Sequence, residues 1–137
     1  MKQTLLLVDD DKFTRQVYKL YFEKHGFIIK EATNGQDATH ILDTNPDIYV
    51  VLLDLLMPMH DGFNFLKNFS RVSLAPGHDF KVILVTGLDE EDYRNNVQIH
   101  SIDTSKVEGF FNKPVDLKEL CNMVKTLHNQ KHLAHQN

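Results

Sequence analysis

Acidic, hydroxyl and ammonium side chains stand directly after short apolar runs in this sequence. The set comprises Asp9, Asp10, Asp54, Thr86 and Lys113. Gathered carboxylates repel one another, so the pKa of at least one of them rises unless a cation is bound. Magnesium fits a sparse acidic cluster, because it takes oxygen ligands and is often held by one or two carboxylates together with phosphate oxygens. Since a lysine can supply a positive charge to a phosphoryl oxygen, the set indicates magnesium-dependent phosphate chemistry.

The apolar runs themselves predict the strands that would bring these side chains together. Three continuous runs lie at residues 5–8, 49–53 and 82–85, and two weaker runs lie at 27–29 and 107–111. Short continuous apolar runs are typical of buried parallel strands. Because helical patterns separate the runs, right-handed crossovers predict a parallel sheet with helices on both faces. Functional groups in such a sheet lie at the carboxyl ends of the strands.

Two apolar stripes at helical spacing predict helices that pack on this sheet. The first stripe is Phe13, Val17, Leu20 and Tyr21, and the second is Leu117, Leu120, Cys121, Val124 and Leu127. Both stripes are predicted to be core. Asp11 is expected to be the N-cap of the first helix and not a metal ligand. Asp116 and Glu119 form a capping-box pattern, which predicts that the last helix begins at Leu117.

The size and composition of the chain indicate one domain. The chain has 137 residues, of which 42% are apolar and 25% charged, and we expect a domain at 1–130 followed by a polar tail at 131–137. A single cysteine, Cys121, indicates a reduced, cytoplasmic compartment. No apolar run approaches the ~20 residues of a membrane helix. A formal charge of −4 without a long basic run argues against direct contact with nucleic acid.

Four motifs, in order along the chain, resemble those of the receiver domain of response regulators. They are Val8-Asp9-Asp10, Asp54 with Met57-Pro58 and Asp61-Gly62, Val85-Thr86-Gly87, and Asn112-Lys113-Pro114. The resemblance spans roughly residues 4–130. It implies an α/β, flavodoxin-like, doubly wound sheet of five parallel strands in the order 2-1-3-4-5, with five helices.

The resemblance also implies roles for the residues near the metal. Asp54 would accept a phosphoryl group from a phosphohistidine, forming an aspartyl phosphate. Asp54 and Asp10 would bind magnesium directly, with Asp9 near the ion or acting through water. The backbone carbonyl of Leu56 would be a further ligand. The resemblance therefore implies a phosphoacceptor signalling domain that catalyses only its own phosphorylation and dephosphorylation.

The resemblance implies a switch and partners as well. Thr86 and Lys113 would contact the phosphoryl oxygens, and Phe110 matches the aromatic residue that moves with Thr86 when the acceptor is phosphorylated. The donor would be a sensor histidine kinase or a histidine phosphotransfer protein. The signal would pass to a downstream protein or to an output domain outside this chain. A homodimer would form through the fourth helix, fifth strand and fifth helix.

Two departures from the common receiver pattern lead to further expectations. Leu56 and Leu88 are apolar where family members often carry polar groups that admit the attacking water, so we expect slow loss of the phosphate. The stretch between Thr86 and Lys113 is a few residues longer than usual. We therefore expect a shortened, irregular or mobile fourth helix within residues 89–101.

Three alternatives were weighed against this interpretation. A pseudo-receiver would keep the fold without phosphorylation, but its usual sign, a missing acidic residue or lysine, is absent. A phosphatase of the haloacid-dehalogenase type would need a second aspartate at the position of Leu56. His128, His132 and His135 have spacings that could form a metal site, although a frayed polar tail over residues 129–137 is favoured.

Overall fold

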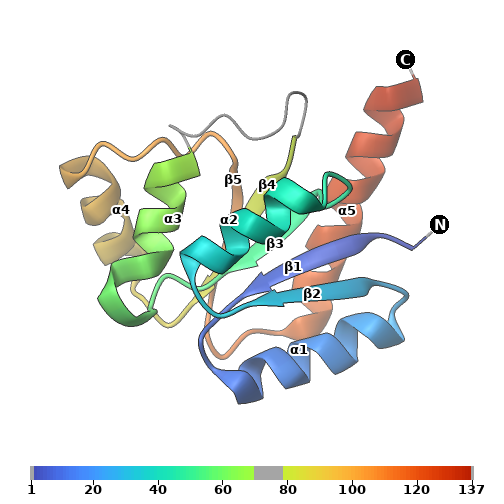
Figure 1. The fold of residues 1–137 in the computed structure, drawn as a ribbon, viewed down its shortest axis with the longest axis horizontal. Coiled ribbons are helices and arrows are strands. Elements are labelled where there is room, and N and C mark those ends of the chain that lie inside the picture. Colours follow the sequence, from blue (N-terminus) through green and yellow to red (C-terminus); the bar gives the residue numbers. More distant parts are fainter. Residues whose placement is uncertain (1, 70–78, 137) are drawn as a thin grey trace.

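Five parallel strands form one sheet in the computed structural model of the chain, which describes residues 2–69 and 79–136 (Figure 1). The sheet order is β2-β1-β3-β4-β5, as the family resemblance implied. The elements, in chain order, are β1 (Thr4–Val8), α1 (Lys12–Lys24), β2 (Ile28–Ala32), α2 (Gly35–Thr44), β3 (Val50–Leu53), a 3₁₀ turn (Pro58–His60), α3 (Asp61–Phe69), β4 (Lys81–Thr86), α4 (Glu90–Ile99), β5 (Val107–Asn112) and α5 (Leu117–Gln136). None of the described helices is long and apolar enough to span a membrane.

The central strands are apolar on both faces because each face packs on helices. Alternate residues of β1 contribute to opposite cores: Leu6 packs on the side of α2 and α3, whereas Leu5 and Leu7 pack on the side of α1 and α5. Side chains of a strand alternate between faces, so a continuous apolar run supplies both cores at once. The sheet order and its two covered faces therefore confirm the predicted doubly wound fold.

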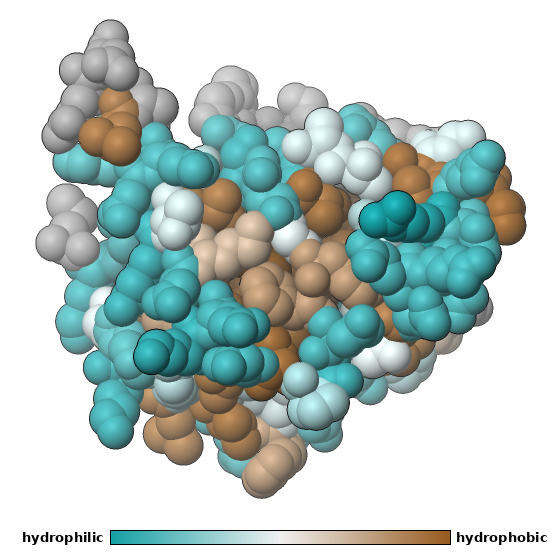
Figure 2. Space-filling view, turned by 180° about the vertical axis from the view of Figure 1, so that it is seen from behind, coloured by the Kyte–Doolittle hydropathy of each residue, from teal (hydrophilic) through white to brown (hydrophobic). Residues whose placement is uncertain are grey.

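The predicted core stripe of α1 is wrong. Phe13 and Leu20 are each 72% exposed and Val17 is 36% exposed, whereas Phe22 is fully buried. Tyr21 is partly buried and packs against the core together with Phe22. The packing face is thus rotated away from the stripe, because helical periodicity identifies an apolar face but not whether other elements cover it. Hydrophobic surface lies along the lower edge of Figure 2, on the side where α1 runs.

The predicted stripe of α5 is core, and the helix begins at Leu117 as expected. Leu120, Cys121, Val124 and Leu127 are buried, and Leu117 is partly buried. The Oδ1 atom of Asp116 accepts hydrogen bonds from the backbone N–H of Lys118 at 2.9 Å and of Glu119 at 3.3 Å. The helix continues to Gln136, so residues 129–136 extend α5, and fraying of this segment stays a prediction. The domain boundary at residue 130 stays a prediction.

The fourth helix is regular where the sequence predicted irregularity. Residues Glu90–Ile99 form an α-helix, and the Asp89 side chain caps it by accepting a hydrogen bond from the N–H of Glu91 at 2.8 Å. Of the polar residues that suggested disruption, Asn95 and Asn96 lie within this regular helix, and only the stretch from Ser101, which has a positive φ of 51°, follows it. The prediction of an irregular helix is therefore wrong, whereas its mobility stays a prediction. The Ala75-Pro76-Gly77 sequence also predicts a turn, and it lies outside the described residues.

Candidate functional site

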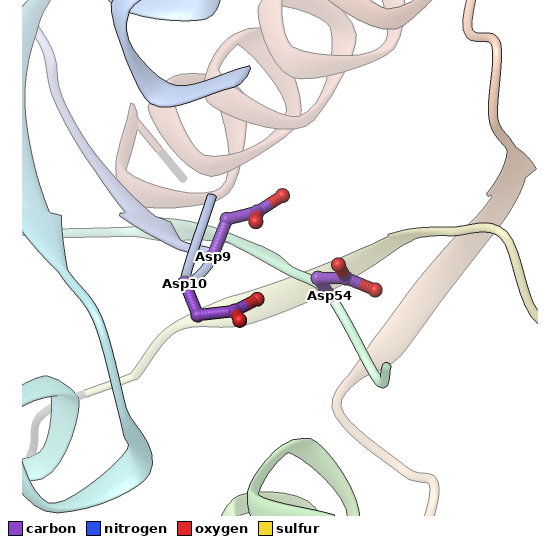
Figure 3. Close-up of side chains that lie close together, drawn as sticks. All are labelled: Asp9, Asp10 and Asp54. Carbon is purple, nitrogen blue, oxygen red and sulfur yellow. The ribbon is translucent and has the colours of Figure 1, made fainter. Parts of the chain in front are cut away.

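Three carboxylates meet at the carboxyl ends of β1 and β3 (Figure 3). Asp9, Asp10 and Asp54 each offer an oxygen atom, and these three atoms lie within 4.8 Å of one another. Asp9 and Asp54 are 7% and 5% exposed, while Asp10 is exposed. Figure 3 shows the three side chains extending from neighbouring strand ends. The structure thus places these predicted site residues together.

The pairing of the strands explains this convergence. β1 lies between β2 and β3, and Val8 is paired with Leu53. The backbone N–H of Asp54 donates to the carbonyl of Val8 at 2.9 Å, and that of Asp9 donates to the carbonyl of Ala32 at 3.1 Å. Asp9 and Asp54 therefore start their loops at the same level of the sheet.

Lys113 joins the two buried carboxylates from the end of β5. Its Nζ lies 2.7 Å from Oδ2 of Asp9 and 3.0 Å from Oδ2 of Asp54. Burial alone would lower the pKa of Lys113, but the hydrogen bonds to Asp9 and Asp54 outweigh burial and raise the pKa. The pKa of Asp9 is also raised, because burial outweighs the hydrogen bonds from Lys113 and the Asp11 backbone. Lys113 is thus held as a cation, and the ionisation of Asp9 depends on the positive charge close to it.

The second oxygen of each buried carboxylate is held by the following loop. Oδ1 of Asp9 accepts from the N–H of Asp11 at 2.9 Å, and Oδ1 of Asp54 accepts from the N–H of Leu56 at 2.9 Å. Among the described residues, the carboxylate of Asp10 has no hydrogen-bond partner. The two buried carboxylates are thereby oriented before any ligand arrives, and Asp10 is left available.

Asp11 has a different role from its neighbours, as predicted. Its side chain accepts a hydrogen bond from the N–H of Thr14 at 3.0 Å and caps α1. The hydrogen bonds from Thr14 lower the pKa of this carboxyl. Asp11 is therefore the helix cap and stands outside the acidic cluster.

Thr86 ends β4 and is fully buried. Its Oγ1 accepts a hydrogen bond from the N–H of Leu88 at 3.2 Å, and its carbonyl accepts one from the N–H of Lys113 at 2.9 Å. The side chain of Asn112 donates to the carbonyl of Leu88 at 2.7 Å. Thr86 is thus tied both to the loop that leads into α4 and to the loop that carries Lys113.

Phe110 is partly buried on β5 and contacts α4 through an aromatic residue that the sequence reasoning missed. Its ring centroid lies 5.4 Å from that of Tyr93, which lies 6.5 Å from that of Phe63 on α3. Tyr93 is the one buried residue of α4, and burial raises the pKa of its phenol. The three rings link α3, α4 and β5. The signal for Tyr93 was that it is the only aromatic residue of α4, whose other apolar residues are Val97 and Ile99.

An apolar pocket adjoins the acidic cluster. Its volume is about 500 Å³, and its lining includes Asp10, Leu56, Met59, Phe63 and Leu88. Leu56 is 52% exposed. Leu56 and Leu88, which depart from the common receiver pattern, therefore both line this pocket next to the carboxylates.

Gly62 sets the distance between α3 and the strand end that carries Asp54. A Cβ atom at Gly62 would lie 2.4 Å from the carbonyl oxygen of Asp54 and 2.7 Å from Cα of Leu55. The preceding Asp61 accepts a hydrogen bond through Oδ2 from the N–H of Gly35, at the start of α2. Only glycine permits this approach, so the Asp61-Gly62 motif anchors α3 directly behind the acidic cluster.

The histidines of α5 do not share one environment. His128 is buried against the rings of Phe27 and Tyr49, with centroids 5.8 Å away in both cases, and its Nδ1 lies 3.0 Å from the carbonyl of Val124. His132 is exposed, and the His135 side chain lies outside the described residues. The alternative of a histidine metal site gains no support from this arrangement, because His128 faces the core.

Comparisons with known proteins agree with this geometry. The sequence matches the family described as response regulator receiver domain over residues 5–125. It is 31% identical over 134 residues to the transcriptional regulatory protein SrrA of Staphylococcus aureus, covering 93% of this chain and 48% of that protein. The chain therefore spans about half the length of this curated relative.

Solved structures have the same fold. The receiver domain of the Francisella response regulator 1452 superposes with a TM-score of 0.76 at 26% identity, covering 95% of this chain and 99% of that one. A response regulator receiver domain from Clostridium thermocellum superposes with a TM-score of 0.77 at 23% identity, covering 96% and 98%. At this lower identity the likeness concerns the fold alone.

Proposed function

Because the chain belongs to the family of response regulator receiver domains, we propose that it accepts a phosphoryl group from a phosphohistidine onto Asp54. Receiver domains of response regulators are phosphorylated by histidine kinases and connect to output domains. One observation carries the choice of acceptor. Asp54 is buried at the end of β3, its two oxygens are oriented by Lys113 and by the N–H of Leu56, and it shares the crevice with two further carboxylates.

The residues present fit a magnesium ion. Three carboxylates whose oxygens lie within 4.8 Å of one another, accompanied by one ammonium, match the preference of magnesium for oxygen ligands and for sites that it shares with phosphate. Asp10 and Asp54 would hold the ion, with Asp9 bound directly or through water and the Leu56 carbonyl as a further ligand. The ion would supply positive charge against the oxygens of the transferring phosphoryl group.

The transfer itself is a substitution at phosphorus. A carboxylate oxygen of Asp54 forms the new P–O bond while the P–N bond to the donor histidine breaks, and the imidazole nitrogen keeps the bonding electron pair. The product is an aspartyl phosphate and a free histidine. Lys113 already contacts Asp54, so its ammonium would follow a phosphoryl oxygen after transfer. Catalysis of this kind is mostly positioning and electrostatic stabilisation.

The phosphoryl group would be sensed through Thr86 and Phe110. In the structure the Thr86 hydroxyl accepts a hydrogen bond from the N–H of Leu88, and phosphorylation would add acceptor oxygens to which this hydroxyl could donate its own proton. Movement of Thr86 toward the phosphoryl group would open space for Phe110, whose ring now contacts Tyr93. Phe lacks a hydroxyl, so its inward rotation costs no buried hydrogen bond.

The partners follow from this role. The donor would be a sensor histidine kinase or a histidine phosphotransfer protein in the cytoplasm. The receiver would act on a downstream protein or on an output domain outside this chain, without touching nucleic acid itself. A homodimer would use the face formed by α4, β5 and α5.

The apolar pocket supports a long-lived phosphate. Leu56 and Leu88 line the space next to the cluster, and neither side chain can hydrogen-bond an attacking water. We expect Leu56→Asn to speed autodephosphorylation, measured as decay of the phosphorylated species after removal of the donor. An unchanged decay rate would show that Leu56 does not limit water attack.

Treatment with acetyl phosphate and magnesium tests the acceptor. Intact mass should increase by one phosphoryl group in the wild type and stay unchanged in Asp54→Asn and in wild type with excess chelator. Circular dichroism should confirm that Asp54→Asn is folded. No mass gain in the wild type would make the chain a pseudo-receiver, and turnover of a small phosphate ester would instead support the dehalogenase-type phosphatase.

A further inference from the structure

We infer that Arg15 is a positioning residue for the metal-binding carboxylates, an inference that rests on the proposed magnesium-dependent phosphorylation. Arg15 lies on the first turns of α1 and does not touch a carboxylate of the cluster. Its Nη1 donates to the backbone carbonyl of Asp9 at 2.8 Å, and its Nε donates to Oε1 of Glu31 at 3.2 Å. The side chain is only 13% exposed. Arg15 therefore spans the gap between the end of β1 and the edge strand β2.

The carbonyl that Arg15 holds belongs to the peptide unit that joins Asp9 to Asp10. A peptide unit is planar, so a hydrogen bond to its oxygen restricts the rotation of the whole unit and narrows the range of directions in which the Asp10 side chain leaves the backbone. The N–H of Asp9 is already fixed on the carbonyl of Ala32 at 3.1 Å. Arg15 thus supplies a further restraint at this strand end, beside the hydrogen bond from the N–H of Asp11 to Oδ1 of Asp9.

Asp10 needs this restraint more than the buried carboxylates do. Asp9 and Asp54 are oriented by hydrogen bonds to their own side chains, whereas the carboxylate of Asp10 is exposed and has no partner among the described residues. The position of Asp10 is therefore set by its backbone. A ligand held in place costs less conformational entropy on metal binding than a mobile one.

Glu31 orients the guanidinium and compensates its charge. Glu31 is paired with Leu7 in the parallel register of β2 and β1, which places it level with the last residues of β1, and it also lies 3.7 Å from Nζ of Lys19. An uncompensated arginine beside the cluster would repel magnesium. Because Glu31 offsets that charge, the positioning effect should exceed the repulsion, and loss of the Arg15 hydrogen bonds should weaken magnesium binding.

Calorimetric titration of magnesium chloride into the unphosphorylated protein separates the two effects. Arg15→Met keeps most of the aliphatic stem but removes the donors, and its dissociation constant for magnesium should rise by about tenfold, the lower end of what loss of an outer-shell partner costs. The matched control is Arg94→Met, which removes an equal charge. Arg94 pairs with Glu90 at 3.1 Å on α4, is 74% exposed and should leave the dissociation constant unchanged.

Two further variants guard against simple loss of folding. Arg15→Lys retains the charge and one donor but cannot bridge Asp9 and Glu31 as a planar fork, so it should recover part of the affinity. Glu31→Gln leaves Arg15 in place and uncompensated, and should also weaken magnesium binding. Melting curves by circular dichroism establish that each variant is folded at the titration temperature.

Phosphorylation by acetyl phosphate supplies an independent readout. If Arg15 is a positioning residue, Arg15→Met should raise the magnesium concentration needed for half-maximal rate while leaving the rate at saturating magnesium close to that of the wild type. A general structural role would instead lower the saturating rate.

Each outcome decides the inference. An unchanged or tighter magnesium affinity in folded Arg15→Met, or an equal loss in Arg94→Met, would overturn it while the proposed function stands. If the wild type binds no magnesium and accepts no phosphoryl group, the proposed function falls and this inference falls with it.

Discussion

Helices α1 and α5 lie on the same face of the sheet and carry similar apolar stripes, yet the structure uses the two stripes in opposite ways. Leu120 and Val124 of α5 are fully buried, whereas Phe13 and Leu20 of α1 are each 72% exposed. The helix α1 reaches the core instead through Phe22. Identical periodicity therefore specified a helix in both places, but burial depended on how each helix is rotated against the sheet.

The difference teaches that apolar surface is common outside protein cores as well as inside them. Buried polar residues carry more information than exposed apolar ones. Burial of a polar residue therefore shows that the orientation of α5 is more constrained than that of α1, because α5 also buries His128, which is 6% exposed. The Nε2 atom of His128 has no hydrogen-bond partner within the described residues.

The largest expected effect comes from truncating the buried stripe. Leu120→Ala removes a fully buried side chain, so the free energy of unfolding should fall by about 2–5 kcal/mol, from lost transfer free energy and the cavity left behind. Urea unfolding followed by circular dichroism measures this change. A loss below about 1 kcal/mol would mean that α5 packs more loosely than its burial indicates.

A smaller, pH-dependent effect is expected at His128. Burial is the main cause that lowers the pKa of its imidazole below the usual 6.5, partly offset by the hydrogen bond to Val124 and reinforced by Lys131. The unfolded chain therefore binds this proton more readily, so stability rises with pH through the region below about 6.5 and is lost as pH falls. The titratable groups that neighbour His128 are Tyr49 and Lys131. The Nζ of Lys131 lies 4.6 Å from the ring centroid of Tyr49.

Replacement of His128 by Phe keeps a ring in this position and removes the proton. Urea unfolding at pH 7.5 and pH 5.5 should show a smaller pH dependence in His128→Phe than in the wild type. Equal pH dependence in the two proteins would assign the acid sensitivity to other groups.

The smallest effect is expected on the exposed stripe. Leu20→Ala changes a side chain that is 72% exposed, and the free energy of unfolding should move by no more than about 0.5 kcal/mol. Leu20→Ala and Leu120→Ala remove the same atoms from two helices, so they form a matched pair. Similar losses in both would erase the contrast between α1 and α5.

The sequence was sufficient for the sheet and for the acidic cluster because both depend on short-range patterns. Apolar runs bounded by Asp9, Asp54, Thr86 and Lys113 mark strand ends, and parallel topology brings strand ends together. The parallel sheet and the gathering of Asp9, Asp10 and Asp54 match these expectations, whereas the full strand order was implied by the family resemblance.

Other features depend on contacts between distant segments. The exposure of Phe13, the single aromatic anchor of α4 at Tyr93 and the reach of Arg15 to the Asp9 carbonyl each require knowledge of how a helix is rotated or where a side chain ends. The spacing of apolar residues along a helix gives neither its rotation against the sheet nor the position of a side-chain end. Of the polar residues that suggested a disrupted α4, Asn95 and Asn96 are accommodated within the helix, and those from Ser101 onward fall after Ile99. The boundary of a helix is less certain than its presence.

The bridge formed by Lys113 has a consequence for the charge balance of the site. With all four groups ionised, three carboxylates and one ammonium leave two negative charges, which one divalent cation neutralises. A phosphoryl group on Asp54 replaces a single negative charge by about two, so the neutral assembly gains close to one negative charge. If Asp54 is phosphorylated as proposed, an electrically balanced crevice would become a local anion, and the signal would be a departure from neutrality.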